Sequence, residues 1–490
     1  MVDARGLHPL SCKYSTERLP RHSAINNIVE RALGVAGFPS QLEPLRLDCS
    51  DTKLESPCQS NPYHVGKAEE NQQHIRQQYA EFDKKSDIPI IQLSHQDYDV
   101  TGSWTIIPIL HRIRFNDVKW VFLCEDVTRI NLKMLLKVLR NYSYDQEWFL
   151  GHALRDQEAT IIHHFAFHED PMKFSYPSFA SGFAFSNGLL ARLLSEQTRK
   201  PKLNQFSIDP KHELAMYIKD STGGVELTHV PEFCLAINYS QNCASYISET
   251  FPSCPSKSSE DFVVAVKTYS KFYDTRVQVT QNTWAPFVQN LIYFGDVENS
   301  TIPVKSLGIP NTKAGHCAKT IAIMKYFLLN LLKHRWLVIV DDDTIFSISR
   351  MKQLLNCYDS SNHLALGERY GFQTSSSTGY DYITGGGGMV FSSATVKKLI
   401  ENDECKCPNN DSPDDMILGM CLKRLNLPVT HSAAFHQARP NDYSHEYLAS
   451  HLPLSFHKHW LIDPIEVYNS WFRKEDEKMI VHKNMKHNEL

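Results

Sequence analysis

The feature that most constrains the fold is an internal repeat in the amino-acid sequence. The segment "WVFLCEDVTRINLKMLLKVL" begins at Trp120, and "WLVIVDDDTIFSISRMKQLL" begins at Trp336. Both contain a tryptophan, a short apolar run, an acidic cluster, a threonine and then apolar residues at helical spacing. A leucine-glycine pair follows at the same distance in each copy, at Leu150 and at Leu366. The chain is therefore predicted to contain two copies of one supersecondary unit.

Three further pairs of similar segments follow in the same order. "GFAFS" (182–186) matches "GMVFS" (388–392), "SIDPKHELAMYI" (207–218) matches "SPDDMILGMCL" (412–422), and "THVPEFC" (228–234) matches "THSAAFH" (430–436). The distance between partners drifts along the chain, as expected when loops gain or lose residues. Chance explains one such match, whereas several in one order indicate a duplicated unit.

Each copy alternates short apolar runs with helical patterns. In the second copy the runs at 261–268, 289–296 and 336–342 are predicted as buried strands, and 318–334 and 349–358 as helices. This order is typical of right-handed crossovers between parallel strands. We therefore predict an α/β protein with two tandem Rossmann-like domains, whose central sheets are mainly parallel and flanked by helices.

The composition is that of an ordinary globular protein, with 42% hydrophobic and 22% charged residues among 490. A net charge of −4 does not favour nucleic acid or an anionic membrane surface as a partner. The twelve cysteines include no CxxC motif, so disulfides are favoured over zinc ligation. Four N-x-[ST] sequons, at Asn141, Asn238, Asn299 and Asn410, are typical of a lumenal protein.

The two ends of the chain bear on where the protein resides. The last four residues, His487 to Leu490, read H-N-E-L, a variant of the retrieval signal of the endoplasmic reticulum. We therefore expect a protein of the endoplasmic reticulum lumen. The N-terminus shows no apolar segment of a signal peptide, so the true start is expected to be missing, and membrane contact would require an anchor there. Residues 1–70 are predicted as an extension of low order and 471–490 as a tail that displays the signal.

Three aspartates, Asp341, Asp342 and Asp343, follow a predicted buried strand. In parallel sheets, ligands bind beyond the carboxyl ends of the strands. Adjacent carboxylates there suit a hard divalent cation that bridges the phosphates of a substrate and offsets the charge of a diphosphate leaving group. The alternatives are a solvated acidic loop or a helix N-cap.

Two later motifs strengthen the metal and phosphate interpretation. Four glycines, of which Gly386, Gly387 and Gly388 immediately precede an apolar segment, allow the backbone to approach a ligand closely, although a flexible turn is the alternative. "SPDD" places Asp414 and Asp415 at a predicted helix start, where the helix dipole stabilises the carboxylate that a general base requires. Helix capping alone is the alternative for these two acids.

Histidines close to the C-terminus are candidates to complete a metal site. "FHQARP" supplies His436, and "SFHKHW" supplies His457 and His459. Imidazole is a common metal ligand. Each histidine is also compatible with an ordinary place in the core or on the surface.

The motifs together resemble the Fringe-like β-1,3-glycosyltransferases of glycosyltransferase family 31. The resemblance rests on "VIVDDDT", "GERYG", "YITGGGGMVFS", "PDDMILGMC", "PVTHSAAFHQARP" and "SFHKHW". It covers residues from about 260 to 465 strongly and from about 70 to 245 weakly. It implies GT-A folds, Mn²⁺ as cofactor, UDP-glucose as donor, inversion at the anomeric carbon, and β-1,3 transfer to O-linked fucose on thrombospondin type 1 repeats.

The resemblance also implies roles for single residues. Asp343 would coordinate the metal, and Asp341 and Asp342 would help to hold donor and metal beside the glycines. Asp415 would remove the proton from the fucose 3-hydroxyl. The family motif "FHSH" uses its second histidine on the metal, whereas this chain has Ala438 there. His436, His457 or water is therefore expected to replace that ligand.

The first copy lacks several of these features. Val127 stands where the second copy has Asp343, Cys234 where it has His436, and "SGF" where it has four glycines. We therefore expect residues 71–250 to form a non-catalytic domain that helps to bind the folded acceptor, and residues 258–470 to form the catalytic domain. The alternatives are a family 31 galactosyl- or N-acetylglucosaminyltransferase, or a lumenal glycan-binding quality-control protein without activity.

Overall fold

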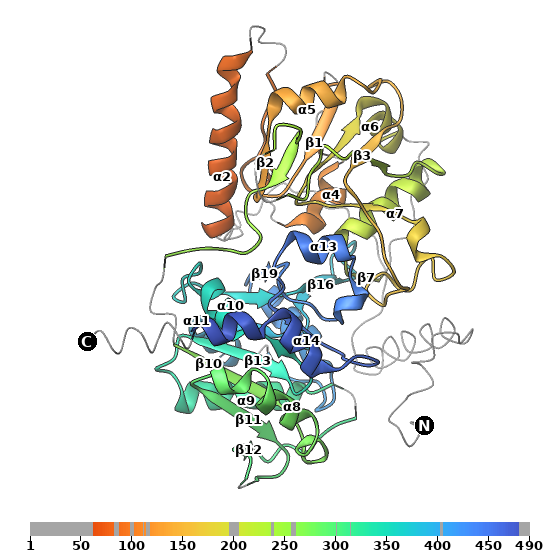
Figure 1. Cartoon of the computed structure of the whole chain (residues 1–490). Helices are drawn as coiled ribbons and strands as arrows, with labels where there is room; N and C mark the ends of the chain where they lie inside the picture. Colours follow the sequence, from red (N-terminus) through yellow and green to blue (C-terminus); the bar gives the residue numbers. More distant parts are fainter. Residues whose placement is uncertain are drawn as a thin grey trace.

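The computed structural model describes residues 62–82, 88–98, 102–110, 112–113, 118–195, 205–236, 240–255, 261–299, 301–313, 315–401 and 405–479. Two regions lie one above the other in Figure 1, the first from α2 (Pro62–Gln77) to β9 (Ser245–Ile247) and the second from β10 (Phe262–Lys267) to α14 (Pro464–Trp471). Within the described ranges, no helix is long and apolar enough to cross a membrane. The H-N-E-L ending, Asn238 and residues 1–61 lie outside the described residues.

The second region contains a seven-stranded sheet. Its strands lie in the order β12 (Val304–Ser306), β11 (Leu291–Gly295), β10, β13 (Trp336–Asp341), β18 (Met389–Ser392), β15 (Ala365–Gly367) and β19 (Val429–His431). The first four strands are parallel, β18 is antiparallel to both neighbours, and β15 pairs with β19 in parallel. The predicted, mainly parallel sheet is confirmed for this region.

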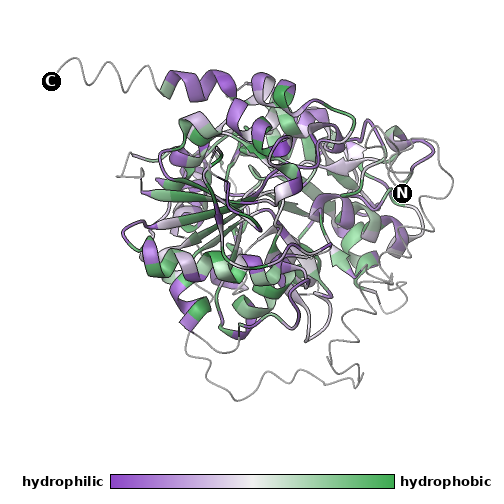
Figure 2. Cartoon of the chain, turned by 90° about the horizontal axis from the view of Figure 1, so that it is seen from below, coloured by the Kyte–Doolittle hydropathy of each residue, from purple (hydrophilic) through white to green (hydrophobic). Residues whose placement is uncertain are grey.

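Helices cover both faces of this sheet. Alternate residues of a strand point to opposite faces, and those of β10 and β13 divide between two buried apolar clusters. One cluster is completed by α9 (Cys317–Asn330), α11 (Ser393–Glu401) and α12 (Asp414–Arg424), the other by α8 (Arg276–Asn282), α10 (Ile348–Leu355) and α14. Figure 2 shows apolar residues concentrated on the central strands and polar residues on outward helix surfaces. The helices predicted at 318–334 and 349–358 correspond to α9 and α10.

The first region contains a four-stranded sheet that is mainly antiparallel. Its strands lie in the order β1 (Trp120–Leu123), β6 (Phe183–Ser186), β3 (Phe149–Gly151) and β8 (Thr228–His229). Only β3 and β8 are parallel. The prediction of a mainly parallel sheet is wrong here. In the described part of this region, no strand corresponds to β10, β11 or β12, which contribute most of the parallel pairing in the second region.

The remaining strands reproduce the repeat found in the sequence. Trp120 lies opposite Ser186 in the first sheet, as Trp336 lies opposite Ser392 in the second. The helices follow in the same order, with α5 (Leu132–Leu139), α6 (Asn187–Leu193) and α7 (Pro210–Thr222) at the positions of α10, α11 and α12. The first region therefore matches the second half of the second region.

Short elements complete the two regions and join them. They are α3 (Ser94–Asp97), α4 (Ile106–Leu110), α13 (His445–Ser450), β2 (Thr128–Ile130) paired with β9, β4 (Ala153–Leu154) with β5 (Tyr176–Pro177), β14 (Ile345–Phe346) with β20 (Ser455–Phe456), and β16 (Arg369–Phe372) with β17 (Tyr380–Ile383). The strand β7 (Phe206–Ser207) belongs to the first region but pairs with β16 of the second. This pairing connects the two regions through backbone hydrogen bonds.

The helix α2 begins inside the stretch that the sequence predicted to be of low order. The Tyr63 hydroxyl donates to the Glu249 carboxylate at 2.6 Å, and His64 Nδ1 lies 2.7 Å from Asp126 Oδ2. Asn71 donates to the backbone carbonyl of Thr128 at 2.6 Å. Residues 62–70, which were expected to belong to the extension of low order, are therefore helical and packed against the first region.

Four disulfides confirm the interpretation of the cysteines. Cys234–Cys243 lies in the first region, and Cys254–Cys357 joins the connecting segment to the residues just after α10. The other two bridges hold the segment before α12: Cys317–Cys407 joins it to α9, and Cys405–Cys421 joins it to α12. Among the described residues, Cys124 is a free thiol. The last two bridges fix the start of α12, the helix that carries Asp414 and Asp415.

Candidate functional site

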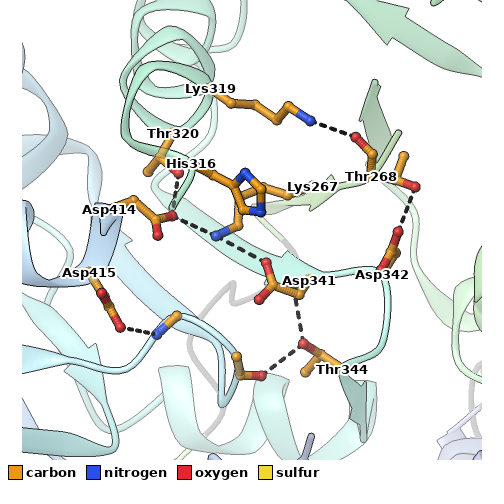
Figure 3. A network of polar contacts seen from close by, with 12 residues as sticks. Lys267, Thr268, His316, Lys319, Thr320, Asp341, Asp342, Thr344, Asp414 and Asp415 are labelled. Carbon is orange, nitrogen blue, oxygen red and sulfur yellow. Dashed lines mark hydrogen bonds and ion pairs between the residues drawn. The ribbon is translucent and has the colours of Figure 1, made fainter. Parts of the chain in front are cut away.

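The acidic triplet lies in a tight, packed turn at the end of β13. The Thr344 hydroxyl accepts from the Asp341 amide at 3.1 Å and donates to the Gly386 carbonyl at 2.8 Å, which fixes the turn against the glycine loop (Figure 3). The Trp284 indole donates to the Thr344 carbonyl at 3.0 Å. The triplet is therefore part of a rigid site, and the alternative of a solvated acidic loop does not apply.

Asp341 and Asp343 converge with His457 from the segment after β20. His457 Nε2 lies 2.9 Å from Asp343 Oδ1 and 3.8 Å from Asp341 Oδ2. The three possible ligand atoms lie within 4.8 Å of one another. His457 Nδ1 lies 3.1 Å from the Gln437 carbonyl, a contact that holds a proton on Nδ1 and leaves Nε2 for a cation. Two carboxylates and one imidazole form a donor set that fits Mn²⁺.

Asp342 points away from this group. Its carboxylate accepts from the Thr268 hydroxyl at 2.7 Å and pairs with Arg276 at 3.1 Å. Burial, together with the charge of Asp343, raises the pKa of Asp342 to about 6. Arg276 also lies 3.0 Å from Asp343 Oδ2. Asp342 therefore anchors the turn, while Asp341 and Asp343 converge on His457.

His436 has a different environment from His457. It is 1% exposed, with Nδ1 3.0 Å from the Ala434 carbonyl and Nε2 3.3 Å from Nε2 of His451. Burial holds its pKa well below the usual range, so the ring is neutral. Ala438, at the position of the family's second histidine, is buried in the core. Of the expected replacements, the geometry brings His457 to the acids and leaves His436 in the core.

The glycine loop between β17 and β18 packs directly on the metal-ligand candidates. A Cβ on Gly386 would lie 2.3 Å from the His457 ring, so no larger residue fits there. Gly388 has a φ of +102°, a backbone conformation that favours glycine. The Gly387 amide donates to Gln437 Oε1 at 2.8 Å. The glycines therefore serve close approach rather than flexibility.

Asp415 lies in the first turn of α12, as the sequence predicted, and faces the same loop. Its Oδ2 accepts from the Gly385 amide at 3.3 Å, and its Oδ1 accepts from the Met416 amide at 2.8 Å. Burial and the neighbouring charge of Asp414 raise the pKa of Asp415 to about 6. The N-cap residue of α12 is Pro413. A carboxylate with this pKa is ionised at neutral pH and is a competent base.

Lys267, at the end of β10, contacts two acids of the candidate site, and the sequence analysis missed it. Its Nζ lies 3.0 Å from Asp341 Oδ1 and 2.6 Å from Asp414 Oδ2, and the Thr320 hydroxyl donates to the same Asp414 oxygen at 2.6 Å (Figure 3). The buried ammonium thus links the acidic turn to the helix of Asp415. A lysine that ends the fully apolar run "FVVAV" was the available signal.

A pocket of about 360 Å³ opens beside Asp343. Its lining includes Arg276, Lys458, His459 and Trp460. The guanidinium of Arg439 lies 3.7 Å from the centre of the Trp460 ring and holds the indole at the rim. Asp342 and Asp343 also line the pocket and pair with Arg276, so a diphosphate here would be met by Lys458 and, once a cation is held by the acids, by Arg276.

The equivalent position in the first region is occupied by protein cations. Asp209, the counterpart of Asp415, lies 2.8 Å from Lys211 Nζ and 3.0 Å from His163 Nε2. His163 Nδ1 lies 2.6 Å from Asp156, and the two carboxylates raise the pKa of His163 to about 9. His212 stacks on His163 at 4.0 Å, so the two rings lie parallel and cannot direct their lone pairs at one ion. Asp156, His163 and Asp209 therefore form an ion-pair network on which His212 stacks, although the spacing of Asp156, His163 and His212 resembles a metal site.

The chain is similar to glycosyltransferases over most of its length. The Fringe family (Fringe-like) matches residues 45–237 and 257–488, so both regions are covered. Human β-1,3-glucosyltransferase is 47% identical over 425 residues, which span 86% of this chain and 84% of that protein. The mouse β-1,3-glucosyltransferase is 46% identical over 434 residues, or 87% and 88% of the two chains. The chain belongs to the Fringe-like family and is a β-1,3-hexosyltransferase.

Proposed function

We propose that the enzyme transfers glucose from UDP-glucose, with inversion and with Mn²⁺ as cofactor, to the 3-hydroxyl of O-linked fucose on thrombospondin type 1 repeats. The observation that carries the proposal is the convergence of Asp341, Asp343 and His457 across the glycine loop from Asp415. Identity to two β-1,3-glucosyltransferases supports glucose as the sugar. The H-N-E-L ending supports residence in the endoplasmic reticulum lumen.

In this proposal, the residues of the acidic turn hold the donor. Asp341, Asp343 and His457 would hold the Mn²⁺ ion, which when bound offsets negative charge on the diphosphate. The pocket beside Asp343 supplies Arg276 and Lys458 as further contacts for the diphosphate oxygens. The close-packed backbone of Gly386, Gly387 and Gly388 would form the wall against which the sugar of the donor lies.

Asp415 acts as the base. Its ionised carboxylate takes the proton of the fucose 3-hydroxyl while the hydroxyl oxygen attacks the anomeric carbon of glucose. The bond from that carbon to the diphosphate oxygen breaks on the opposite face, so UDP leaves with the electron pair and the configuration inverts. The ammonium of Lys267 lies 2.6 Å from the Asp414 carboxylate and keeps it ionised. The charge of Asp414 in turn raises the pKa of Asp415 and makes it a stronger base.

A donor panel tests the proposal. The purified full-length chain would be assayed with UDP-glucose, UDP-galactose and UDP-N-acetylglucosamine against one folded, O-fucosylated thrombospondin repeat. We expect transfer from UDP-glucose, loss of transfer after treatment with EDTA, and recovery on addition of Mn²⁺. A faster reaction with either of the other two donors, or full activity in EDTA, would contradict the proposed donor or the proposed metal.

A further inference from the structure

A large cavity of about 1500 Å³ lies at the junction of the two regions. The first region contributes Glu125, at the end of β1, together with Asp209 and Lys211, at the start of α7. The second region contributes Glu368, after β15, and Tyr447 of α13, and Figure 1 shows α13 directly beneath the first region. The repeat places Glu125 at the position of Asp341. The cavity is thus the counterpart of the catalytic site, and residues of the second region form part of its wall.

The cavity is unsuited to a nucleotide sugar. Val127 stands at the position of Asp343, and "SGF" (181–183) replaces the glycine loop. The glutamates and Asp209 would repel a diphosphate, and Lys211 is committed to Asp209 at 2.8 Å. The cavity therefore has to be considered for a different ligand.

Two carboxyl groups in this cavity form no ion pair with a described side chain, and Lys211, the lysine whose charge acts on both of them, is already paired with Asp209 at 2.8 Å. Glu125 makes no side-chain hydrogen bond or ion pair among the described residues, and burial raises its pKa to about 7. Glu368 accepts from the Gln437 amide and from the Tyr443 hydroxyl, and burial raises its pKa to about 8. Both side chains line the open space. Carboxyl groups in this state are stabilised when a positive charge enters beside them.

Glu368 also connects the cavity to the catalytic site. Its carboxylate accepts from the Gln437 amide, and the side chain of Gln437 accepts from the Gly387 amide at 2.8 Å. The Glu368 carbonyl accepts from the Thr384 amide at 3.0 Å, one residue before the glycine loop. A molecule that binds in the cavity would therefore lie one layer of residues from the loop that faces Asp415.

We propose that the cavity binds a lysine or arginine side chain of the folded protein acceptor, whose charge is met by Glu125 and Glu368. This inference rests on the proposed function in taking a folded glycoprotein as the acceptor. Tyr447 adds an aromatic face to the site, and it already packs against a cation, since Lys211 Nζ lies 4.3 Å from the ring centre. The contact gives the non-catalytic region a direct part in positioning the acceptor.

Direct binding tests the proposal without any sugar donor. The full-length enzyme would be titrated onto an immobilised, folded, O-fucosylated thrombospondin repeat. We expect Glu125→Gln to raise Kd roughly tenfold, because the substitution removes a charge that meets the acceptor cation. Glu226→Gln is the matched control, because Glu226 is an exposed carboxylate of the same region that pairs with Lys219 at 2.6 Å. Its Kd should equal that of the wild type, and thermal melting of both variants checks folding.

A second acceptor identifies the chemistry that is recognised. A repeat with its surface lysines and arginines replaced by glutamine should bind the wild type about tenfold more weakly and should be insensitive to Glu125→Gln. An equal effect of Glu125→Gln on both repeats, or unchanged binding by Glu125→Gln, would overturn the proposal. The proposal would also be overturned if the effect of Glu125→Gln on Kd disappeared with a repeat that lacks fucose but persisted with the repeat that lacks basic residues. That result would indicate a sugar ligand. Because no donor is present, the result is independent of which sugar the enzyme transfers.

Discussion

The sequence repeat matches Asp415 with Asp209, and both lie at a helix start, Asp209 as the N-cap of α7 and Asp415 as the second residue of α12. The protein around them gives the two carboxyl groups opposite properties. Asp209 lies between Lys211 and His163, which hold its pKa well below the usual range. Among the described residues, Asp415 accepts hydrogen bonds from backbone amides alone, and burial together with the charge of Asp414 raises its pKa to about 6. A helix start therefore carries a structural ion pair in one region and the proposed base in the other.

The acidic turns of the two regions differ in the same sense. In the second region Asp343 meets His457 at 2.9 Å, and Asp343 lines an open pocket. In the first region Val127 takes the place of Asp343, and Asp126 is paired with His64 at 2.7 Å. A duplicated unit thus keeps its strands and helices while its polar groups are either left available for substrate or paired within the protein.

The largest expected effect is on Asp415. Asp415→Asn should lower kcat by about a thousandfold, because an amide cannot accept the proton of the attacking hydroxyl. Initial rates of UDP release at saturating donor and acceptor measure this effect. Asp411→Asn, at an exposed position shortly before α12, is the control and should retain wild-type activity. If Asp415→Asn kept more than a tenth of the wild-type kcat, Asp415 would not be the base, and the proposed difference in role between Asp415 and Asp209 would be wrong.

The two candidate histidines should separate clearly. His457→Ala should raise the Mn²⁺ concentration that gives half-maximal activity by about a hundredfold, because it removes a proposed ligand. His436→Ala should lower the thermal midpoint while the Mn²⁺ requirement stays near that of the wild type, since His436 packs against His451 and Tyr443 in the core. Titration of activity with Mn²⁺ checks both variants. The opposite pattern would assign the metal to His436.

Asp209 should matter for stability. Asp209→Asn should lower the free energy of unfolding by about 3 kcal/mol, because it leaves the buried cations of Lys211 and His163 without their shared partner. Denaturant unfolding measures the change, and Asp220→Asn, at an exposed position of the same helix, is the control. Unchanged stability of Asp209→Asn would show that the network of the first region is not a structural ion pair.

The pH dependence of the rate should follow Asp415. Its carboxyl group has to be ionised to act as a base, and its pKa of about 6 lies above the usual value. The logarithm of kcat should therefore be level at neutral pH and fall about tenfold per pH unit below 6. The same raised pKa means that protonation of Asp415 favours the folded state, so the loss of rate on mild acidification is not caused by unfolding at this group. A rate that stays level down to pH 4.5 would contradict the assignment.

The sequence predicted the site residues that are defined by their local context. Asp341 to Asp343 lie at the end of a buried strand, the glycines precede another strand, and Asp415 lies in the first turn of a helix. Each of these patterns can be recognised from about ten neighbouring residues. The repeat likewise predicted which strands of the two regions correspond. The pairing of Trp120 with Ser186 and of Trp336 with Ser392 confirms this prediction.

The remaining features depend on contacts between distant segments. Lys267 meets Asp414 across the sheet, and the competition between His436 and His457 is decided by which ring packs beside Asp343. Neither contact leaves a local pattern. The antiparallel sheet of the first region was missed for a related reason, because an apolar run does not encode the direction of its neighbour.

Binding of Mn²⁺ to the purified enzyme in the presence of UDP tests the central claim most directly. Calorimetric titration should detect one ion bound by the wild type and an affinity at least about a hundredfold lower for Asp343→Ala, with a matching loss of glucose transfer. Asp343→Ala that binds Mn²⁺ and transfers glucose as the wild type does would contradict the account.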